Sequence, residues 1–212
     1  YLKVCQFKEM NVAIVGATGY GGIQAVNLLK KNKKYKISFL GGNKTSGSKW
    51  NDNFPFIYLD NDPYIEDISV DNISKNSDVA LLCLPNGISS TLTRKLLDRG
   101  VKVIDLSADY RYKSLDEWKK VYSKEAAIYK RSDDDLCKEA VYGLPEINKE
   151  AISKGRLIAC PGCYPTSALI PLAPYLSQGI IENEGIVIDS KSGTSGGGRE
   201  PNQKLLLSEC GE

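Results

Sequence analysis

The fold of this chain is decided by the stretch Val12-Ala13-Ile14-Val15-Gly16-Ala17-Thr18-Gly19-Tyr20-Gly21-Gly22. A short apolar strand runs into a glycine-rich turn, and residues 23–29 continue with apolar side chains at helical spacing. Glycine permits a positive φ, leaves the backbone bare enough for a pyrophosphate to touch, and lets the helix pack closely on the strand. The spacing Gly16-x-x-Gly19-x-x-Gly22 differs from the commoner G-x-G-x-x-G. We therefore predict a strand, a phosphate-binding loop and a helix; the alternative is a glycine turn without a ligand.

Beyond this unit, strand-like and helix-like segments alternate. Such alternation is typical of parallel strands joined by crossover helices, so the predicted fold class is α/β, with a Rossmann-type doubly wound parallel sheet. The polar stretch 108–155 is predicted to be irregular, and to cover a sheet edge or link to a second domain. The predicted strands are 11–16, 35–41, 78–84, 101–106, 156–160 and 186–191, and the predicted helices are 21–31, 88–99 and 164–178.

The residues after the second predicted strand, Asn43-Lys44-Thr45-Ser46, bear on the choice of cofactor. Ligands of doubly wound sheets lie outside the carboxyl ends of the strands, and an NAD site places an Asp or Glu here for the ribose 2′-hydroxyl. Hydroxyl groups and a lysine suit a 2′-phosphate instead. This loop predicts NADP(H) rather than NAD, against the alternative of an ordinary polar loop.

Cys163 is the candidate nucleophile, within Cys160-Pro161-Gly162-Cys163-Tyr164-Pro165-Thr166. The residues after it read as the start of a helix, where unpaired amides and the helix dipole favour a thiolate. A buried, inert thiol is the alternative. The C-x-x-C spacing also leaves open a redox pair of Cys160 and Cys163. We do not expect zinc, because the chain has no histidine and no second C-x-x-C pair.

Composition excludes several classes of partner. Lys and Arg number 28 and Asp and Glu 26, a net charge of +2 that recommends neither nucleic acid nor an acidic membrane surface. No apolar run approaches the roughly 20 residues that span a bilayer. The cysteines, at 5, 83, 137, 160, 163 and 210, lack a disulfide-framework spacing. We expect a reducing, cytoplasmic location, or an organelle if the source is eukaryotic.

A last informative loop, residues 191–199, follows the predicted strand 186–191. It reads Lys191-Ser192-Gly193-Thr194-Ser195-Gly196-Gly197-Gly198-Arg199. Its glycines and hydroxyls leave amides free to meet an anion or a nicotinamide amide. A flexible linker is the alternative.

Taken together, these motifs resemble the N-acetyl-γ-glutamyl-phosphate reductase family of arginine biosynthesis, which is related to aspartate-semialdehyde dehydrogenase. The resemblance implies an NADP-binding Rossmann domain at 1–160, and at 161–212 the start of a second, α+β catalytic and dimerisation domain whose remainder is missing. It implies a homo-oligomer in the full-length form. The motifs that carry it are 16–22, Leu84-Pro85-Asn86-Gly87, 103–111, Ala140-Val141-Tyr142-Gly143-Leu144-Pro145-Glu146, 161–166 and 191–199.

The resemblance also implies the roles of residues. The Cys163 thiolate attacks the carbonyl of a small-molecule acyl phosphate, phosphate leaves, and NADPH delivers hydride to the thioester. Arg111 and Arg199 are candidates for the substrate's carboxylate or phosphate, with Tyr164 and Thr166 beside the nucleophile. The implied cofactor-binding residues are Gly16, Thr18, Gly19, Tyr20, Gly21, Gly22, Asn43, Lys44, Thr45, Pro85, Asn86, Gly87, Ser192 and Gly193.

The sequence departs from the family pattern in three places. The family usually has His at the position of Asn86 and Asn at that of Cys160, and its acid/base histidine lies beyond Glu212. Three alternatives therefore stay open beside the reductase of N-acetyl-γ-glutamyl phosphate. They are an aspartate-semialdehyde dehydrogenase-type reductase, an NADP-binding redox sensor that uses Cys160 and Cys163, and a nucleotide-binding module without catalysis.

Overall fold

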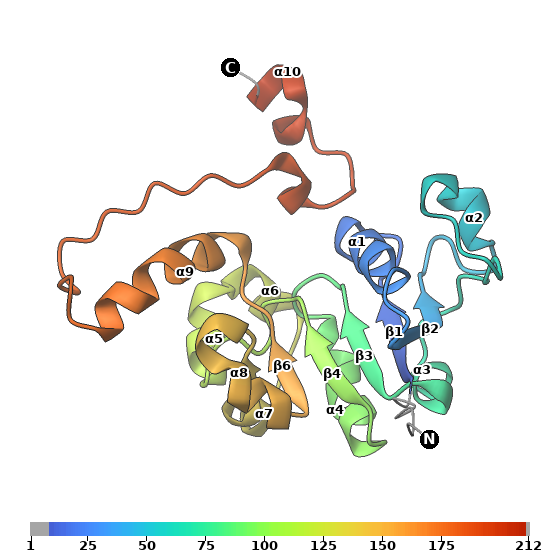
Figure 1. The fold of residues 1–212 in the computed structure, drawn as a ribbon, viewed down its shortest axis with the longest axis horizontal. Helices are drawn as coiled ribbons and strands as arrows, with labels where there is room; N and C mark the ends of the chain where they lie inside the picture. Colours follow the sequence, from blue (N-terminus) through green and yellow to red (C-terminus); the bar gives the residue numbers. More distant parts are fainter. Residues whose placement is uncertain (1–8, 211–212) are drawn as a thin grey trace, which may run out of the picture.

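The computed structural model describes residues 9–210, so Cys5 lies outside the described part. A parallel sheet of six strands, ordered β2-β1-β3-β4-β6-β5, forms its centre (Figure 1). The predicted α/β fold with a parallel sheet is confirmed. The strands are β1 (Met10–Val15), β2 (Tyr35–Gly41), β3 (Val79–Leu82), β4 (Lys102–Asp105), β5 (Val141–Tyr142) and β6 (Leu157–Ala159).

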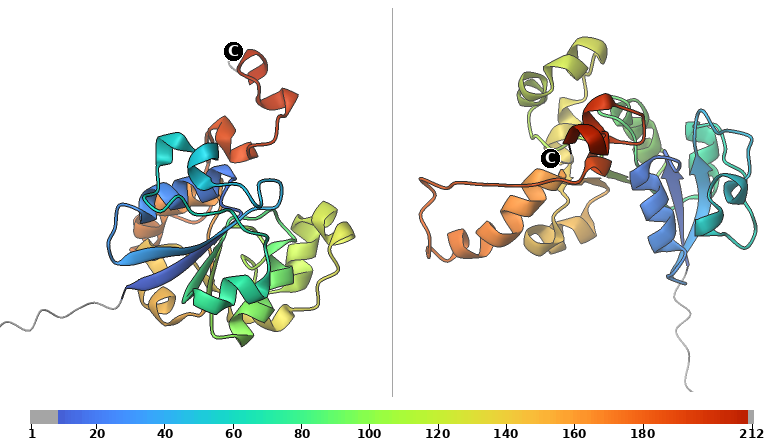
Figure 2. Two further views of the ribbon diagram at one scale, coloured as in Figure 1. Left: turned by 90° about the vertical axis from the view of Figure 1, so that its right-hand side faces the viewer. Right: turned by 90° about the horizontal axis from the view of Figure 1, so that it is seen from above.

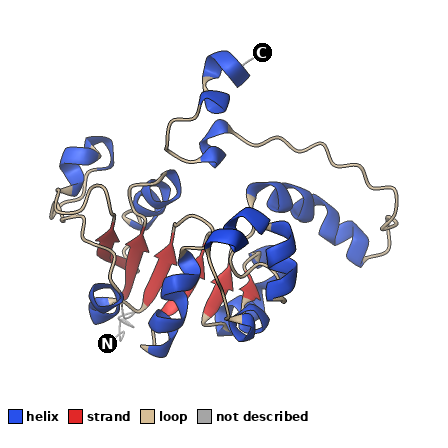
Figure 3. Cartoon of the chain, turned by 180° about the vertical axis from the view of Figure 1, so that it is seen from behind, coloured by secondary structure: helices blue, strands red, loops and turns tan. Residues whose placement is uncertain are grey.

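Helices cover the sheet (Figure 3). Alternate residues of its strands belong to two separate cores. Successive side chains of a strand point to opposite faces. Ile14 accordingly packs with α1 (Tyr20–Leu29), whereas Ala13 and Val15 belong to the cluster that includes Leu96 and Leu97 of α4 (Ser89–Asp98). Full burial of one such aliphatic side chain contributes about 1.5–3 kcal/mol, so both faces hold the sheet in place.

The stretch 108–155 is not irregular, contrary to the prediction. It contains short helices, some of which bury apolar residues deeply, such as Trp118 at 0 % exposed. Each helix is too short to show a long apolar period. The elements here are α5 (Leu115–Val121), α6 (Ser123–Ile128), α7 (Asp134–Glu139), β5 and α8 (Pro145–Lys154). The segment between β2 and β3 also holds α2 (Trp50–Asn53), η1 (Pro55–Ile57) and α3 (Val70–Asn76).

The predicted strand at 186–191 is wrong. After α9 (Cys163–Ser177) the chain is extended, Val187 is 92 % exposed, and within residues 9–210 no strand pairs with this segment. A run of β-branched apolar residues forms a strand only when a neighbouring strand pairs with its backbone amides and carbonyls. The chain then returns above α1 (Figures 1 and 2) through η2 (Thr194–Gly197), η3 (Gln203–Leu205) and α10 (Leu207–Cys210).

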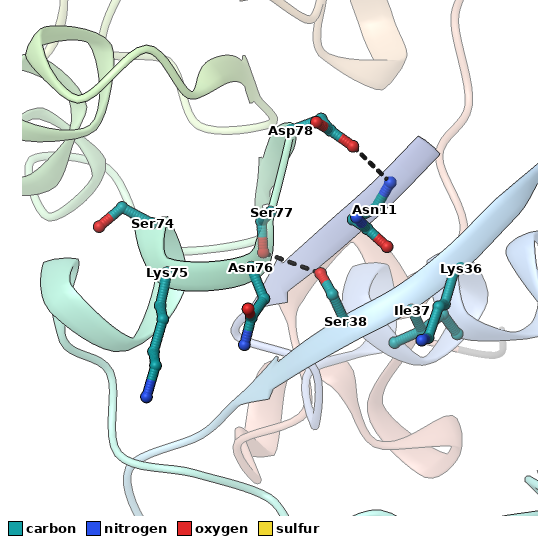
Figure 4. Close-up of a pocket in the computed structure, with 9 residues that line it drawn as sticks. All are labelled: Asn11, Lys36, Ile37, Ser38, Ser74, Lys75, Asn76, Ser77 and Asp78. Carbon is teal, nitrogen blue, oxygen red and sulfur yellow. Dashed lines mark hydrogen bonds between the residues drawn. The ribbon is translucent and has the colours of Figure 1, made fainter. Parts of the chain in front are cut away.

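A polar cavity of about 700 Å³ opens at the amino ends of the strands (Figure 4). Its lining includes Asn11, Ser38, Ser77 and Asp78. The two serine hydroxyls are hydrogen-bonded to each other at 2.8 Å, and the backbone amide of Asn11 donates to the Asp78 carboxylate at 2.8 Å. The motifs singled out in the sequence all lie at the opposite, carboxyl ends. Among the described helices, none is long and apolar enough to cross a membrane.

Candidate active site

The glycine-rich loop lies where the strand order reverses, between β1 and β3. The amides of Gly16 and Ala17 both donate to the carbonyl of Gly41, at 2.9 and 2.8 Å. Gly16 has a φ of +82°, and a Cβ there would lie 2.3 Å from the carbonyl oxygen of Cys83. A Cβ at Gly22 would lie 2.3 Å from the Gly16 carbonyl oxygen. The positive φ and the close packing that the glycine pattern predicts are both present.

The first turn of α1 is available to an anion. The helix begins at Tyr20, directly after Thr18 and the N-cap residue Gly19, and no side chain caps it. Amides in the first helical turn, here including Gly21, have no acceptor within the helix, and the helix dipole favours negative charge at this end. The loop therefore fits the pyrophosphate of a dinucleotide.

The end of β2 offers groups for a second phosphate. The Thr45 hydroxyl oxygen is buried and has no hydrogen-bond partner among the described residues. Asn43 and Lys44 beside it are exposed, and Lys44 Nζ lies 2.5 Å from Glu200 Oε1. An unpartnered hydroxyl and an exposed ammonium on one loop are groups of the kind that bind the 2′-phosphate of NADP(H). The carboxylate that reaches this loop comes from 156 residues further along the chain.

The loop after β3 is fastened to the loop after β4. Asn86 Oδ1 accepts a hydrogen bond from the Ala108 amide at 2.9 Å. The buried Asp109 carboxylate accepts from the amides of Gly87 at 2.6 Å and Ser90 at 2.9 Å. Asp109 therefore caps the start of α4 from another loop, and it fixes the position of the segment from Pro85 to Gly87.

A second buried carboxylate, Asp105, supports this loop pair. It accepts hydrogen bonds from the Ser107 amide at 3.0 Å and hydroxyl at 2.7 Å, and the Asp109 amide donates to that hydroxyl at 3.1 Å. Burial raises the pKa of Asp105 to about 6, the Ser107 hydroxyl partly opposes this, and the charge of Asp109 adds to it. The carboxyl group is thus poised to titrate just below neutral pH.

Tyr129 and Arg131, which sequence reasoning missed, brace the same loops. Gly87 has a φ of +84°, and a Cβ there would lie 2.0 Å from the Tyr129 ring, so the ring packs directly on the glycine backbone. Arg131 Nη1 donates to the Asp109 carbonyl at 2.6 Å. Neither residue belongs to a recognisable sequence motif, and both lie in the stretch that was predicted to be irregular.

Arg131 is the centre of a buried polar network. Its guanidinium binds both carboxylate oxygens of Asp133, at 3.0 and 3.1 Å, and lies 4.9 and 4.5 Å from the ring centres of Tyr110 and Trp118. Burial works against the charge, but Asp133 raises the pKa of Arg131 and keeps it protonated. Burial and the Asp133 charge also raise the pKa of Tyr110, whose hydroxyl donates to Asp133 at 2.6 Å.

Cys163 occupies the first position of α9, as predicted, after the N-cap residue Gly162. Its side chain is exposed, and Ser192 Oγ donates a hydrogen bond to its sulfur at 3.2 Å. Ser192, which was predicted to bind cofactor, thus contacts Cys163 and is followed by Gly193. A hydrogen bond to sulfur stabilises a thiolate, so the arrangement suits nucleophilic attack.

Arg111 holds the backbone that leads to Cys163. Its Nε donates to the Cys160 carbonyl at 2.7 Å and its Nη2 to the Leu106 carbonyl at 2.9 Å. A Cβ at Gly162 would lie 3.1 Å from Nη1. Burial, with the charge of Asp105, raises the pKa of the Cys160 thiol to about 11, so it is protonated at neutral pH.

The remaining predicted residues divide between the two ends of the site. Tyr164 is 54 % exposed beside Cys163, and the Thr166 hydroxyl is bonded to the Gly162 carbonyl at 2.8 Å. Arg199 lies at the other end of the site, where its Nη1 donates to the Thr18 carbonyl of the glycine-rich loop at 3.0 Å. Within residues 9–210, no group of three or more His, Cys, Asp or Glu side chains is placed to hold a metal ion.

Comparison with known proteins agrees with this geometry. The family model described as "Semialdehyde dehydrogenase, NAD binding domain" matches residues 11–155. The chain belongs to the semialdehyde dehydrogenase family. That family's "dimerisation domain" matches residues 163–212, the part that begins at Cys163. The relation to semialdehyde dehydrogenases that the sequence motifs indicated is thereby confirmed.

Curated relatives extend beyond this chain. It is 97 % identical over 203 residues to the N-acetyl-gamma-glutamyl-phosphate reductase of Prochlorococcus marinus strain MIT 9215, and 80 % identical to that of strain MIT 9515. These alignments cover 96 % of this chain and 58 % of each relative. The chain therefore spans little more than half the length of these semialdehyde dehydrogenase-family proteins.

Solved structures share the fold. Aspartate semialdehyde dehydrogenase II of Vibrio cholerae, complexed with ASA, superposes with a TM-score of 0.56 at 23 % identity, covering 80 % of this chain and 47 % of that one. The Candida albicans aspartate semialdehyde dehydrogenase with NADP gives 0.53 at 18 % identity, covering 80 % and 47 %. At such identities the likeness concerns the architecture alone.

Proposed function

We propose that this chain supplies the cofactor-binding half and the nucleophile of an NADPH-dependent N-acetyl-γ-glutamyl-phosphate reductase of arginine biosynthesis. The observation that carries the proposal is Cys163, which stands exposed at the start of α9 with Ser192 donating to its sulfur. Relatives of that name, 80–97 % identical over 203 residues, support the choice of substrate over that of an aspartate-semialdehyde dehydrogenase.

The proposed chemistry begins at Cys163. Its thiolate attacks the acyl-phosphate carbonyl, and the bond from that carbon to the phosphate oxygen breaks. Inorganic phosphate departs, and the acyl group stays on the sulfur as a thioester. NADPH, when bound, supplies the hydride that reduces the thioester carbon. The carbon–sulfur bond then breaks, which releases the semialdehyde and restores the thiolate. Ser192 donates to the sulfur while it carries negative charge.

Roles are proposed for the other residues from their positions. The glycine-rich loop would hold the pyrophosphate, Lys44 and Thr45 the 2′-phosphate, and the segment from Pro85 to Gly87 the remainder of the cofactor. Arg111 would brace the Cys163 loop, because its Nε and Nη2 donate to two backbone carbonyls, and it remains a candidate for the substrate's carboxylate or phosphate. We further propose domains at 1–160 and 161–212 and a homo-oligomeric full-length protein.

The nucleophile is tested by turnover. A longer protein, in which this chain is continued by the remaining residues of the 97 % identical relative, should reduce NADP when given N-acetylglutamate semialdehyde and phosphate. Cys163→Ser should abolish that activity, and Cys137→Ser, which keeps a hydrogen-bonding group beside Arg131, should keep it. Residues 1–212 alone should be slower by about a hundredfold or more, for want of the family's acid/base histidine. Activity in Cys163→Ser would disprove the proposal.

The cofactor is tested by calorimetry. NADPH should bind this chain about tenfold or more tightly than NADH, if the loop after β2 supplies one charge-assisted hydrogen bond to the 2′-phosphate. Equal affinities for NADPH and NADH would refute the proposal that Lys44 and Thr45 bind the 2′-phosphate.

A further inference from the structure

The return segment, residues 193–206, lies over the proposed cofactor site rather than away from it (Figures 1 and 2). Arg199 fixes it there, because its Nη1 donates to the Thr18 carbonyl at 3.0 Å and its guanidinium lies 5.2 Å from the centre of the Phe54 ring. A cavity of about 200 Å³ remains between the segment and Tyr20, the first residue of α1. The segment thus covers the loop without filling the space beside it.

This anchoring brings a carboxylate to the lysine of the β2 loop. Glu200, the neighbour of Arg199, places Oε1 2.5 Å from Lys44 Nζ, and both side chains are more than 80 % exposed. The hydrogen bond from Lys44 lowers the pKa of Glu200, so the carboxylate is charged at neutral pH. The Lys44 ammonium, which is proposed to bind the 2′-phosphate, is therefore already paired with a carboxylate.

We propose that Glu200 is a selectivity-determining residue that competes with the 2′-phosphate of NADP(H) for Lys44. The inference rests on the proposed NADP-binding function. A phosphate monoester carries a charge of about −1.5 to −2 at neutral pH, so it displaces a single carboxylate from the ammonium. Its binding must break the Lys44–Glu200 pair, and the freed carboxylate then repels it. The uncharged 2′-hydroxyl of NADH meets neither penalty.

Glu200 therefore narrows the preference for NADPH over NADH. Removing the Glu200 carboxylate should tighten the binding of 2′-phosphorylated ligands and leave the affinity for other ligands unchanged. Exposed ion pairs are weak, which limits the expected gain to about two- to fivefold. The gain should shrink as salt is added, because ions screen exposed charges at a distance of about 10 Å at 0.1 M.

The experiment is calorimetry on the whole chain with 2′,5′-ADP, NADPH and NADH as probes, so no turnover is needed. The variants are Glu200→Gln, Lys44→Met and the double variant. Glu184→Gln is the matched control, since it removes the same charge from an exposed position after α9.

The expected result is that Glu200→Gln binds 2′,5′-ADP and NADPH about two- to fivefold more tightly and binds NADH as the parent does. Glu184→Gln should leave the affinities for all three probes unchanged. The double variant should bind them as Lys44→Met alone does. If Glu200→Gln matches Glu184→Gln, or tightens NADH equally, the inference fails while NADP binding stands. If the parent chain does not bind 2′,5′-ADP at all, the proposed cofactor and this inference both fail.

Discussion

Replacing Arg131 by Met is expected to destabilise the fold strongly, because the guanidinium is 2 % exposed and its partner Asp133 is 13 % exposed. The substitution deletes the two hydrogen bonds to Asp133 and the one to the Asp109 carbonyl. It leaves the Asp133 carboxylate buried, with the Tyr110 hydroxyl as its remaining donor in the network. Removing one partner of a buried ion pair costs about 3–5 kcal/mol, since the other charge then lies uncompensated in the interior.

Urea denaturation followed by circular dichroism measures this loss. With a slope of about 2 kcal/mol per M, the unfolding midpoint should fall by roughly 2 M. The control is Arg94→Met, which breaks an ion pair with Asp135 at 2.5 Å whose side chains are 46 % and 65 % exposed. Its midpoint should stay near that of the parent chain, because water replaces the lost partner. Equal shifts in the two variants would refute the claim that burial gives the Arg131 network its energy.

Three further outcomes are expected. Because Asp105 binds its proton more tightly in the folded state (pKa about 6) than its ordinary value of 3.8, the free energy of unfolding should fall, by an amount on the order of 3 kcal/mol, as the pH rises from about 4 to 6. Asp105→Asn should lack that slope in pH-dependent denaturation, and a slope unchanged by the substitution would contradict the assignment. Mild oxidation with diamide should join Cys160 to Cys163, with Cys163 reacting first because the raised pKa of Cys160 keeps it a thiol; two free thiols found by mass spectrometry would end this idea. Gly87→Ala should cost more stability than Gly100→Ala, since both have a positive φ but only the first adds a Cβ against a ring; equal melting temperatures would show that the ring moves aside.

The sheet and its glycine-rich loop could be predicted because their signals are local. The apolar run of β1, the glycines at 16 and 22 and the helical spacing of α1 lie within about 20 consecutive residues, and each was found within two residues of its predicted place. The start of α9 at Cys163 was predicted for the same reason. In each case a short stretch contains both the pattern and its physical cause.

The parts that were missed depend on partners far away in the sequence. Arg131 resembles any surface arginine until Asp109 and Tyr110, more than 20 residues earlier, contact its guanidinium, and composition alone does not reveal a buried cation. The run Ile186-Val187-Ile188 has the composition of a strand, but a strand also needs a neighbour, which residues 9–210 do not provide. The contact of Arg199 with Thr18 joins residues 181 positions apart, and no periodic pattern reports such a distance.

That separation sets an order of events while the chain is being made. The last strand of the sheet to be synthesised ends at Ala159, and Arg199 is added 40 residues later, a delay of roughly 2–8 s at 5–20 residues per second. During this interval the sheet can form on the ribosome with its glycine-rich loop still uncovered. A nucleotide that binds then would stabilise the nascent sheet by mass action before the return segment has emerged.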